Sequence, residues 1–320
     1  MSVSITGGIS FSGGVGITAA PTGPVGYFGG GEYPYESTVD RIVYANDTVT
    51  ATIRGPLSVA RRDVAATGTS SYGWYAGGNN PTKFSTIDRI DYAADTATAS
   101  VRGPLTQSIT ASTGVTDGTT YGWFNLGSTA GSGFISNNNR ITFVTDTAVA
   151  SVRGTLSASA YRAGTSTSAY GWMAGGTTGP AFLSLVDRID YANDTGAGST
   201  RGPLSVITYG MGSAGNASYG WFTGGGTPGV PSFSSSVQRI TYATDTATAS
   251  VRGPLFQAVY NNAANGNESY GWVGGGRTIP GSATSNISRI DYSNDTATSS
   301  LRGPLSSARY TMGSTSGVAT

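Results

Sequence analysis

The segment spanning residues 72–105 reads YGWYAGG, then six variable residues, then STIDRIDYAADTATASVRGPL. These phrases return along the whole chain. The aromatic residue of the YGW phrase occurs at Tyr27, Trp74, Trp123, Trp172, Trp221 and Trp272. The arginine of the RI pair occurs at Arg41, Arg89, Arg140, Arg188, Arg239 and Arg289. The arginine of the RG pair follows 13 residues later, at Arg54, Arg102, Arg153, Arg201, Arg252 and Arg302. A regular period of 48 to 51 residues indicates a closed array or a solenoid.

Each repeat contains four short stretches with strand character and no stretch with helical periodicity. In the second repeat, they are residues 64–68, the YGW segment, residues 87–92 and the run TATASVRG. In that run, Ala97, Ala99 and Val101 alternate with polar residues, which predicts a strand buried on one face. Ile90 and Tyr92 share one face of the third strand, and short polar turns such as residues 45–48 join the third strand to the fourth.

Six units of four antiparallel strands predict an all-β, six-bladed β-propeller. The first unit lacks its own first strand, and the chain continues past the last RGPL motif with SSARYTMGSTSGVAT. We therefore expect residues from about 308 to 319 to form the innermost strand of the N-terminal blade and to close the ring. The predicted propeller covers residues 25–320.

Residues 1–24 lie outside the repeat and are rich in Gly, Ser and Thr. They form either a flexible leader or an attachment segment, because Ile5, Ile9, Phe11, Val15 and Ile17 give a loose two-residue period that suits strand addition to a partner. The N-terminus has neither the basic region nor the apolar core of a secretory signal peptide. We expect neither a signal peptide nor a transmembrane segment.

Composition excludes several kinds of chemistry. The chain has no cysteine and no histidine, which removes disulfides, thiolate nucleophiles, histidine acid–base catalysis and zinc sites with sulfur or nitrogen ligands. The formal net charge is only +1, and 11% of the residues are charged, so the sequence lacks the excess of basic residues that is typical of nucleic-acid-binding proteins. No metal or other cofactor is expected.

The repeated residues predict structural roles. A large ring in every unit suits the core between adjacent blades. The two arginine columns and the turn aspartates recur in every unit, whereas a catalytic site breaks symmetry, so we expect them to form repeated hydrogen bonds and ion pairs. The turn aspartates are Asp47, Asp95, Asp146, Asp194, Asp245 and Asp295.

The candidate binding residues lie where the repeats differ. The loops between the second and third strands, and the connections after RGPL, open on the same face of a propeller. Five residues beyond the motif leucine stand Arg62, Thr110, Tyr161, Tyr209, Tyr260 and Tyr310, flanked by Arg61, Arg162 and Arg309. Tyrosine and arginine around a channel opening suit glycan or protein recognition. The alternative is that the tyrosines only plug the opening. The predicted site is Arg61, Arg62, Tyr161, Arg162, Tyr209, Tyr260, Arg309 and Tyr310.

The unit resembles a kelch repeat in its four strands, its Gly-Gly doublet and its closure by a C-terminal strand. It differs in that Trp74 and its equivalents precede the doublet. The repeat phrases, which read YGWVGGG at residues 270–276 and ISRIDYSNDTATSSLRGPLSSAR at residues 287–309, are similar to repeats in predicted virion proteins of marine bacteriophages, notably cyanophages. The resemblance covers residues 25–318, with residues 287–309 as the nearest copy, and it implies a structural or fibre-like role in a particle.

These observations lead us to expect a non-enzymatic virion structural protein of the tail-fibre or appendage type, released by host lysis. Its expected partners are other virion proteins through residues 1–24 and a host-surface glycan or receptor, and a homo-oligomer is compatible with the sequence. The alternatives are a purely architectural capsid or tail decoration protein and a lectin-like propeller. Enzymes are not expected, because copper oxidases need histidine, no sialidase motif is present, and no acidic pair breaks the repeat symmetry.

Overall fold

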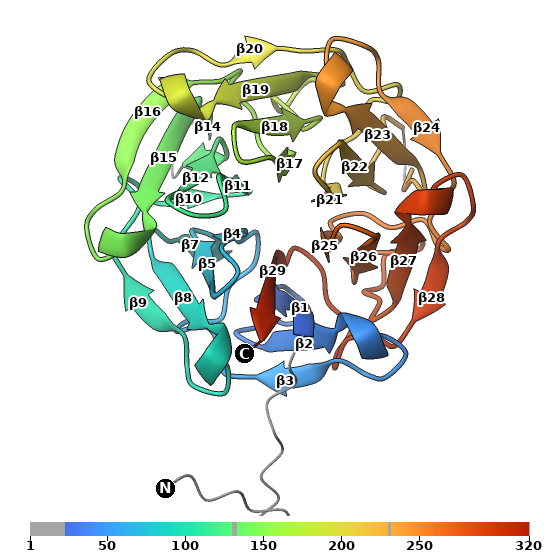
Figure 1. Cartoon of the computed structure of the whole chain (residues 1–320), viewed down its shortest axis with the longest axis horizontal. Coiled ribbons are helices and arrows are strands. Elements are labelled where there is room, and N and C mark those ends of the chain that lie inside the picture. Colours follow the sequence, from blue (N-terminus) through green and yellow to red (C-terminus); the bar gives the residue numbers. More distant parts are fainter. Residues whose placement is uncertain (1–22, 130–132, 230–231, 320) are drawn as a thin grey trace, which may run out of the picture.

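Each repeat folds into four short antiparallel strands, because runs of alternating side chains end at glycine pairs or polar turns. The computed structural model describes residues 23–129, 133–229 and 232–319. In these residues, six four-stranded sheets, which we call blades 1 to 6, stand around a central axis (Figure 1). The expected all-β propeller is confirmed.

The four strands of each blade follow one another outward from the axis. From the inside, blade 1 contains β29 (Gly313–Ala319), β1 (Gly23–Gly29), β2 (Val39–Val43) and β3 (Thr52–Arg54). Blade 2 contains β4 (Ala65–Gly68), β5 (Tyr72–Ala76), β8 (Ile87–Asp91) and β9 (Ser100–Arg102). Blade 3 contains β11 (Thr113–Thr116), β12 (Tyr121–Asn125), β15 (Asn137–Thr142) and β16 (Ser151–Thr155). Blade 4 contains β17 (Ala163–Ser166), β18 (Tyr170–Ala174), β19 (Val186–Asp190) and β20 (Ser199–Thr200). Blade 5 contains β21 (Gly212–Gly215), β22 (Tyr219–Thr223), β23 (Val237–Thr241) and β24 (Ser250–Arg252). Blade 6 contains β25 (Ala263–Gly266), β26 (Tyr270–Gly274), β27 (Ile287–Asp291) and β28 (Ser300–Arg302).

The remaining elements are short. Two small sheets come from loops and consist of β6 (Asn79–Asn80) with β7 (Thr82–Lys83), and β10 (Ile109–Thr110) with β13 (Ser128–Thr129) and β14 (Gly133–Phe134). A single-turn 3₁₀ helix follows the third strand of each blade. These helices are η1 (Tyr44–Asn46), η2 (Tyr92–Ala94), η3 (Phe143–Thr145), η4 (Tyr191–Asn193), η5 (Tyr242–Thr244) and η6 (Tyr292–Asn294).

The C-terminal strand closes the ring as expected. β29 pairs with β1 in antiparallel register, from Gly29 opposite Gly313 to Gly23 opposite Ala319. β1 therefore begins two residues before the boundary drawn from the sequence. The rest of the expected leader, residues 1–22, lies outside the described residues.

The fourth strands differ from the expectation. β9 covers only Ser100–Arg102, and although Ala99 is buried, Val101 is 60% exposed. Ala97 is exposed as well, so the predicted burial of Ala97 and Val101 is wrong. β9 is the outermost strand of its blade, at the circumference of the ring (Figure 1), and Val101 faces solvent there.

The tryptophan, arginine and aspartate columns meet between adjacent blades. Trp74 Nε1 of blade 2 donates to Asp146 Oδ2 of blade 3 at 2.8 Å. Arg89 and Arg102 pair with the same oxygen at 3.1 and 3.5 Å. The Trp74 ring also stacks on Phe143 of blade 3, with ring centroids 4.2 Å apart. The expected structural roles of these columns are confirmed.

This arrangement, which we call the inter-blade node, occurs at all six interfaces. Its acceptors are Asp47, Asp95, Asp146, Asp194, Asp245 and Asp295, and Tyr27 takes the tryptophan's place in blade 1. The node that joins blade 6 to blade 1 uses Trp272 and Asp47, so the ring closes with the same chemistry.

The glycine of each RG pair allows the next blade to approach closely. The Gly103 N–H donates to the Asp146 carbonyl at 2.8 Å. A Cβ at Gly103 would lie 1.9 Å from the Ala148 carbonyl oxygen. Any side chain at this position would push blades 2 and 3 apart, which explains the recurring glycine.

Candidate binding site at the channel mouth

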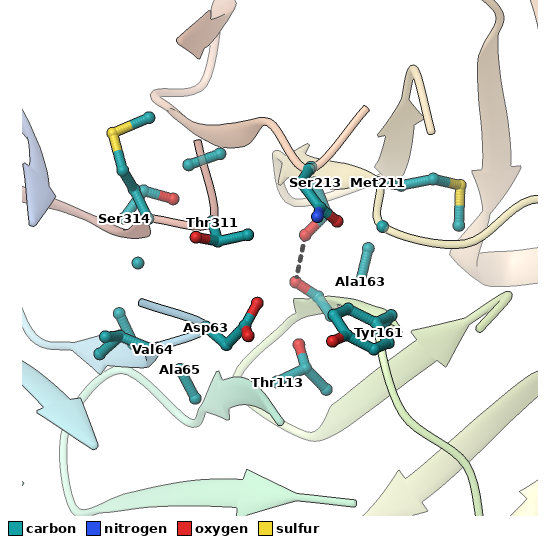
Figure 2. Close-up of a pocket in the computed structure, with 18 of the residues that line it drawn as sticks. Asp63, Val64, Ala65, Thr113, Tyr161, Ala163, Met211, Ser213, Thr311 and Ser314 are labelled. Carbon is teal, nitrogen blue, oxygen red and sulfur yellow. Dashed lines mark hydrogen bonds between the residues drawn. The ribbon is translucent and has the colours of Figure 1, made fainter. Parts of the chain in front are cut away.

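The axial channel opens into a cavity of about 170 Å³ at one end. The cavity is lined by the residues at the start of each innermost strand, and Figure 2 shows it from close range. We call this end the channel mouth. The lining segments are residues 63–66, 111–114, 161–164, 210–213, 261–264 and 311–314.

A closed cycle of backbone hydrogen bonds encircles the mouth. In each blade, one residue just before the innermost strand has a left-handed φ between 54° and 63°. These six residues are Asp63, Ala111, Tyr161, Gly210, Asn261 and Thr311. The N–H of each donates to the carbonyl of its neighbour in the ring at 2.8–3.2 Å, and the Asp63 N–H closes the cycle on Thr311. The cycle therefore uses all six N–H groups of these residues.

The side chains of this ring break the six-fold symmetry. Among the described residues, Asp63 is the only acidic one that lines the cavity. Its carboxylate and the Tyr161 hydroxyl point into the cavity (Figure 2). Burial first, and then the charge of Asp63, raise the pKa of Tyr161 to about 12, so its hydroxyl stays protonated and can donate.

Tyr161 occupies a different position from the other predicted tyrosines. Tyr209, Tyr260 and Tyr310 form equivalent bridges to the loops after the second strands. Ala160 makes that bridge in blade 4. The connection before blade 4 is one residue shorter than the others, which moves Tyr161 inward to the backbone ring.

Aromatic residues cluster on one side of the mouth. Tyr209 and Tyr260 meet edge to face with centroids 5.0 Å apart. Phe182 stacks on Tyr209 at 4.5 Å, and Phe233 stacks on Tyr260 at 5.4 Å. The ring position beside them is Gly210, where a Cβ would lie 2.4 Å from the Tyr260 ring, so only glycine leaves room for that ring.

Charged residues lie on another side of the mouth. Arg62 NH1 pairs with Glu32 Oε2 at 2.6 Å, and Arg62 Nε lies 3.6 Å from Asp63 Oδ2. The Arg62 guanidinium also lies 5.5 Å from the Tyr35 ring centroid. Arg277 lies 5.3 Å from the ring centroid of Tyr310. The predicted Arg62 and Tyr310 thus lie beside residues that the sequence did not single out.

Three of the predicted site arginines are interior residues. The side chains of Arg61, Arg162 and Arg309 are fully buried. They pair with Asp88, Asp187 and Asp40 at 3.1, 2.7 and 3.1 Å, each within its own blade. An arginine whose fork is held by a buried carboxylate has no free donors for an external ligand, so these three side chains do not form the exposed rim that was expected, although Arg162 lies in the cavity wall.

Sequence reasoning missed Glu32 and Asp63. Both carboxylates reach the same guanidinium of Arg62, so they form the asymmetric acidic pair that the sequence was judged to lack. Asp63 could have been found, because the run Arg61-Arg62-Asp63 puts a cluster of charge where other connections carry neutral residues. Glu32 comes from a distant loop, and only the fold brings it close.

The burial of Asp63 predicts a pH-dependent stability. Burial raises the pKa of this carboxyl to about 6 from its ordinary 3.8, and Arg62 opposes that shift only partly. The folded state therefore holds the Asp63 proton more tightly than the unfolded state. The free energy of unfolding should fall as pH rises from about 4 to about 6, because the unfolded state loses this proton first. Relative to an Asp63→Asn variant, the wild type should lose roughly 3 kcal/mol of unfolding free energy across this window.

Urea unfolding of both proteins at several pH values tests this prediction. The difference between the two proteins isolates Asp63, because all other titrating groups are shared. A difference that stays constant with pH would show that Asp63 titrates near its ordinary value.

Comparisons with known proteins support the fold and leave the function open. No family model matches the chain, and no curated protein sequence matches it. Among solved structures, one titled "Structure of YjhT" has a similar fold, with a TM-score of 0.71 and 13% sequence identity. The match covers 87% of this chain and 94% of that one. At this identity, the likeness concerns the propeller fold alone.

Two features are absent from the part of the chain that the structure describes. None of its helices is long and apolar enough to cross a bilayer. No group of three or more Asp or Glu side chains in the same residues is placed to hold a metal ion.

Proposed function

We propose that this protein is a non-enzymatic structural component of a phage particle that binds a host-surface glycan at its channel mouth. The virion role rests on the resemblance of the YGW to RGPL phrases to phage repeats. The binding role rests on the contrast between a repeated framework and an asymmetric mouth.

That contrast is the observation that carries the proposal. The inter-blade node recurs at all six interfaces, with Tyr27 in place of tryptophan at one of them, because every interface packs the same pair of surfaces. The ring at the mouth instead carries a different residue in each blade. A surface that varies within an otherwise repeated molecule suits recognition of one asymmetric ligand.

The residues at the mouth suit a carbohydrate. Tyr209, Tyr260 and Tyr310 are partly exposed, so they offer flat apolar faces and hydroxyls together. Arg62 and Glu32 add a donor fork and a carboxylate beside them. Sugars present apolar ring faces and hydroxyl groups, which such a mixture complements.

The path of the chain favours display of the mouth. Gly29 and Gly313 pair at the mouth end of blade 1, whereas Gly23 and Ala319 pair at its opposite end. The chain thus enters the propeller from the face opposite to the mouth. If residues 1–24 attach the protein to a particle, the mouth faces outward.

The carboxylates of the mouth fit ligand binding better than hydrolysis. Glu32 is held by Arg62, and the side chain of Asp63 is only 7% exposed. A two-carboxylate hydrolase needs two carboxyl groups that reach opposite sides of a glycosidic bond. The purely architectural alternative leaves the mouth without a ligand.

Binding to a glycan array and to intact host cells tests the proposal. The wild type should bind saturably, and a Tyr209→Ala/Tyr260→Ala variant should bind at least about ten-fold more weakly, because two stacking faces are lost. Val144→Ala is the matched control, since Val144 is 86% exposed on an outer turn far from the mouth.

Thermal melting of each variant must show an intact fold. An absence of wild-type binding to every glycan and cell would overturn the proposal and favour the architectural role. Cleavage of a bound oligosaccharide, followed by chromatography, would contradict the non-enzymatic part.

A further inference from the structure

We propose that the channel mouth binds a ligand carrying a protonated amine, with the Asp63 carboxylate as its counter-ion. The ligand class is an amino sugar with a free ammonium group. This inference deepens the proposed function and rests on it, since it assigns the chemistry of the glycan at the same mouth.

The first argument is the charge that faces the cavity. Within the described part of the chain, Asp63 and Arg162 are the only charged residues that line it. Arg162 NH1 is bound to Asp187 at 2.7 Å, and its other nitrogens donate to the Gly175 and Leu185 carbonyls. Its side chain is fully buried, so Asp63 is the charge that the cavity presents.

The second argument is the balance of donors and acceptors. The backbone ring uses its own six N–H groups, so none of them remains for a ligand. The lining side chains are rich in oxygen, including the hydroxyls of Thr113, Ser213 and Thr311 (Figure 2). An ammonium group has three donors and no acceptor, so it suits a site that mainly accepts hydrogen bonds.

The third argument is that the two cations that act on Asp63, Arg62 and Lys83, are engaged by other groups. Arg62 is shared between Glu32 and Asp63, so these three groups together carry one excess negative charge. The Lys83 ammonium donates to Ser128 Oγ at 2.6 Å and to the Thr129 carbonyl at 2.7 Å. Lys83 is therefore held on a neighbouring loop by groups other than Asp63.

The aromatic surroundings favour an organic cation over a metal ion. Tyr161 follows Asp63 and Ala111 in the backbone ring, and Tyr209 and Tyr260 lie next along the mouth. Aromatic faces attract ammonium groups by cation–π interaction. A hard metal ion usually requires several carboxylates, and the described residues place only Asp63 in the cavity wall.

The raised pKa of Asp63 gives the inference a signature in pH. An ammonium ligand needs the ionised carboxylate, so while the amine stays protonated its affinity should fall as pH drops through about 6. Well below that pH, affinity should fall about ten-fold per pH unit, because the fraction of ionised Asp63 falls in the same proportion.

Calorimetric titration with two matched sugars tests the inference. The probes are the glucosamine trimer and its fully N-acetylated counterpart, which differ in the charge of the amines. The wild type should bind the amine form at least about ten-fold more tightly at neutral pH. Asp63→Asn should abolish the preference, whereas Glu268→Gln should keep it, since Glu268 is an exposed carboxylate on a turn at the opposite face.

The outcomes separate this inference from the proposed function. Equal affinity for both trimers would overturn the ammonium inference and leave glycan binding standing. If neither trimer binds but lysine amide binds through Asp63, the ammonium inference stands and the glycan proposal fails. If none of the three probes binds, both fail. The wild-type pH profile needs no variant, so it tests the role of Asp63 even if Asp63→Asn does not fold.

Discussion

Replacing Asp194 by alanine should destabilise the propeller by roughly 3 kcal/mol or more. Asp194 Oδ2 accepts a hydrogen bond from Trp123 Nε1 at 2.9 Å and pairs with Arg140 at 3.0 Å and Arg153 at 3.7 Å. The substitution leaves a buried indole N–H without an acceptor and two guanidinium groups without a counter-ion. Those groups lie between blades 3 and 4, so the substitution weakens one of the six interfaces that close the ring.

Asp190→Ala is the matched control. Asp190 is exposed and lies four residues earlier in the chain, where its carboxylate accepts the Ala192 N–H at the start of η4. Losing this cap should cost about 1 kcal/mol. Urea unfolding of both variants measures the free energy of unfolding that each substitution removes. If Asp194→Ala loses as little as Asp190→Ala, the inter-blade node contributes little to stability.

Replacing Arg61 by isoleucine should cost about 3–5 kcal/mol, because it leaves the Asp88 carboxylate buried without its ion-pair partner. Both side chains are fully buried, and Arg61 NH2 lies 3.1 Å from Asp88 Oδ2. Asp88 also accepts the Ser58 N–H at 3.0 Å, which cannot balance a full charge.

Blade 3 supplies the compensating change. At the equivalent positions it carries Ile109 and Asn139, and Asn139 Oδ1 accepts the Thr106 N–H just as Asp88 accepts that of Ser58. The double variant Arg61→Ile/Asp88→Asn copies this neutral pair into blade 2. It should unfold within about 1 kcal/mol of the wild type, since a buried ion pair and a neutral pair differ little in net stability.

Unfolding of the single and double variants in urea completes this test. Asp88→Asn alone should also be destabilised, because it leaves Arg61 buried without a counter-charge. A double variant as unstable as Arg61→Ile would show that the arginine acts through shape rather than charge.

The internal repeat is the reason that sequence reasoning reached the fold. A strand assignment that is uncertain in one repeat is supported by the same pattern in the other five. Strand order, blade closure and the structural role of Trp74 and Asp146 could therefore all be predicted. The fourth strand was predicted poorly, because its alternation at Ala97 and Val101 shows a preference for strand but not whether another layer covers it. Val101 is exposed because β9 is the outermost strand of its blade.

The candidate site was predicted only in part. Tyr161 lines the cavity, and Arg62, Tyr209, Tyr260 and Tyr310 lie around it because their position follows from the connection after RGPL. Their role in binding stays a prediction. Sequence reasoning cannot separate an arginine that faces solvent from one that faces a carboxylate of its own blade. Arg61 and Arg62 are adjacent in the chain, yet the Arg61 side chain is buried and the Arg62 side chain is partly exposed.

By itself, the sequence determined the propeller, its closure and the face that varies, because these depend on periodicity along the chain. The tertiary structure decided which charges remain available at that face. Arg61 is neutralised by Asp88 on a strand of its own blade, and Asp63 faces the cavity as one member of a backbone ring completed by five residues distant in the sequence. Burial and pairing depend on contacts between distant residues, so they appear only when the blades are assembled.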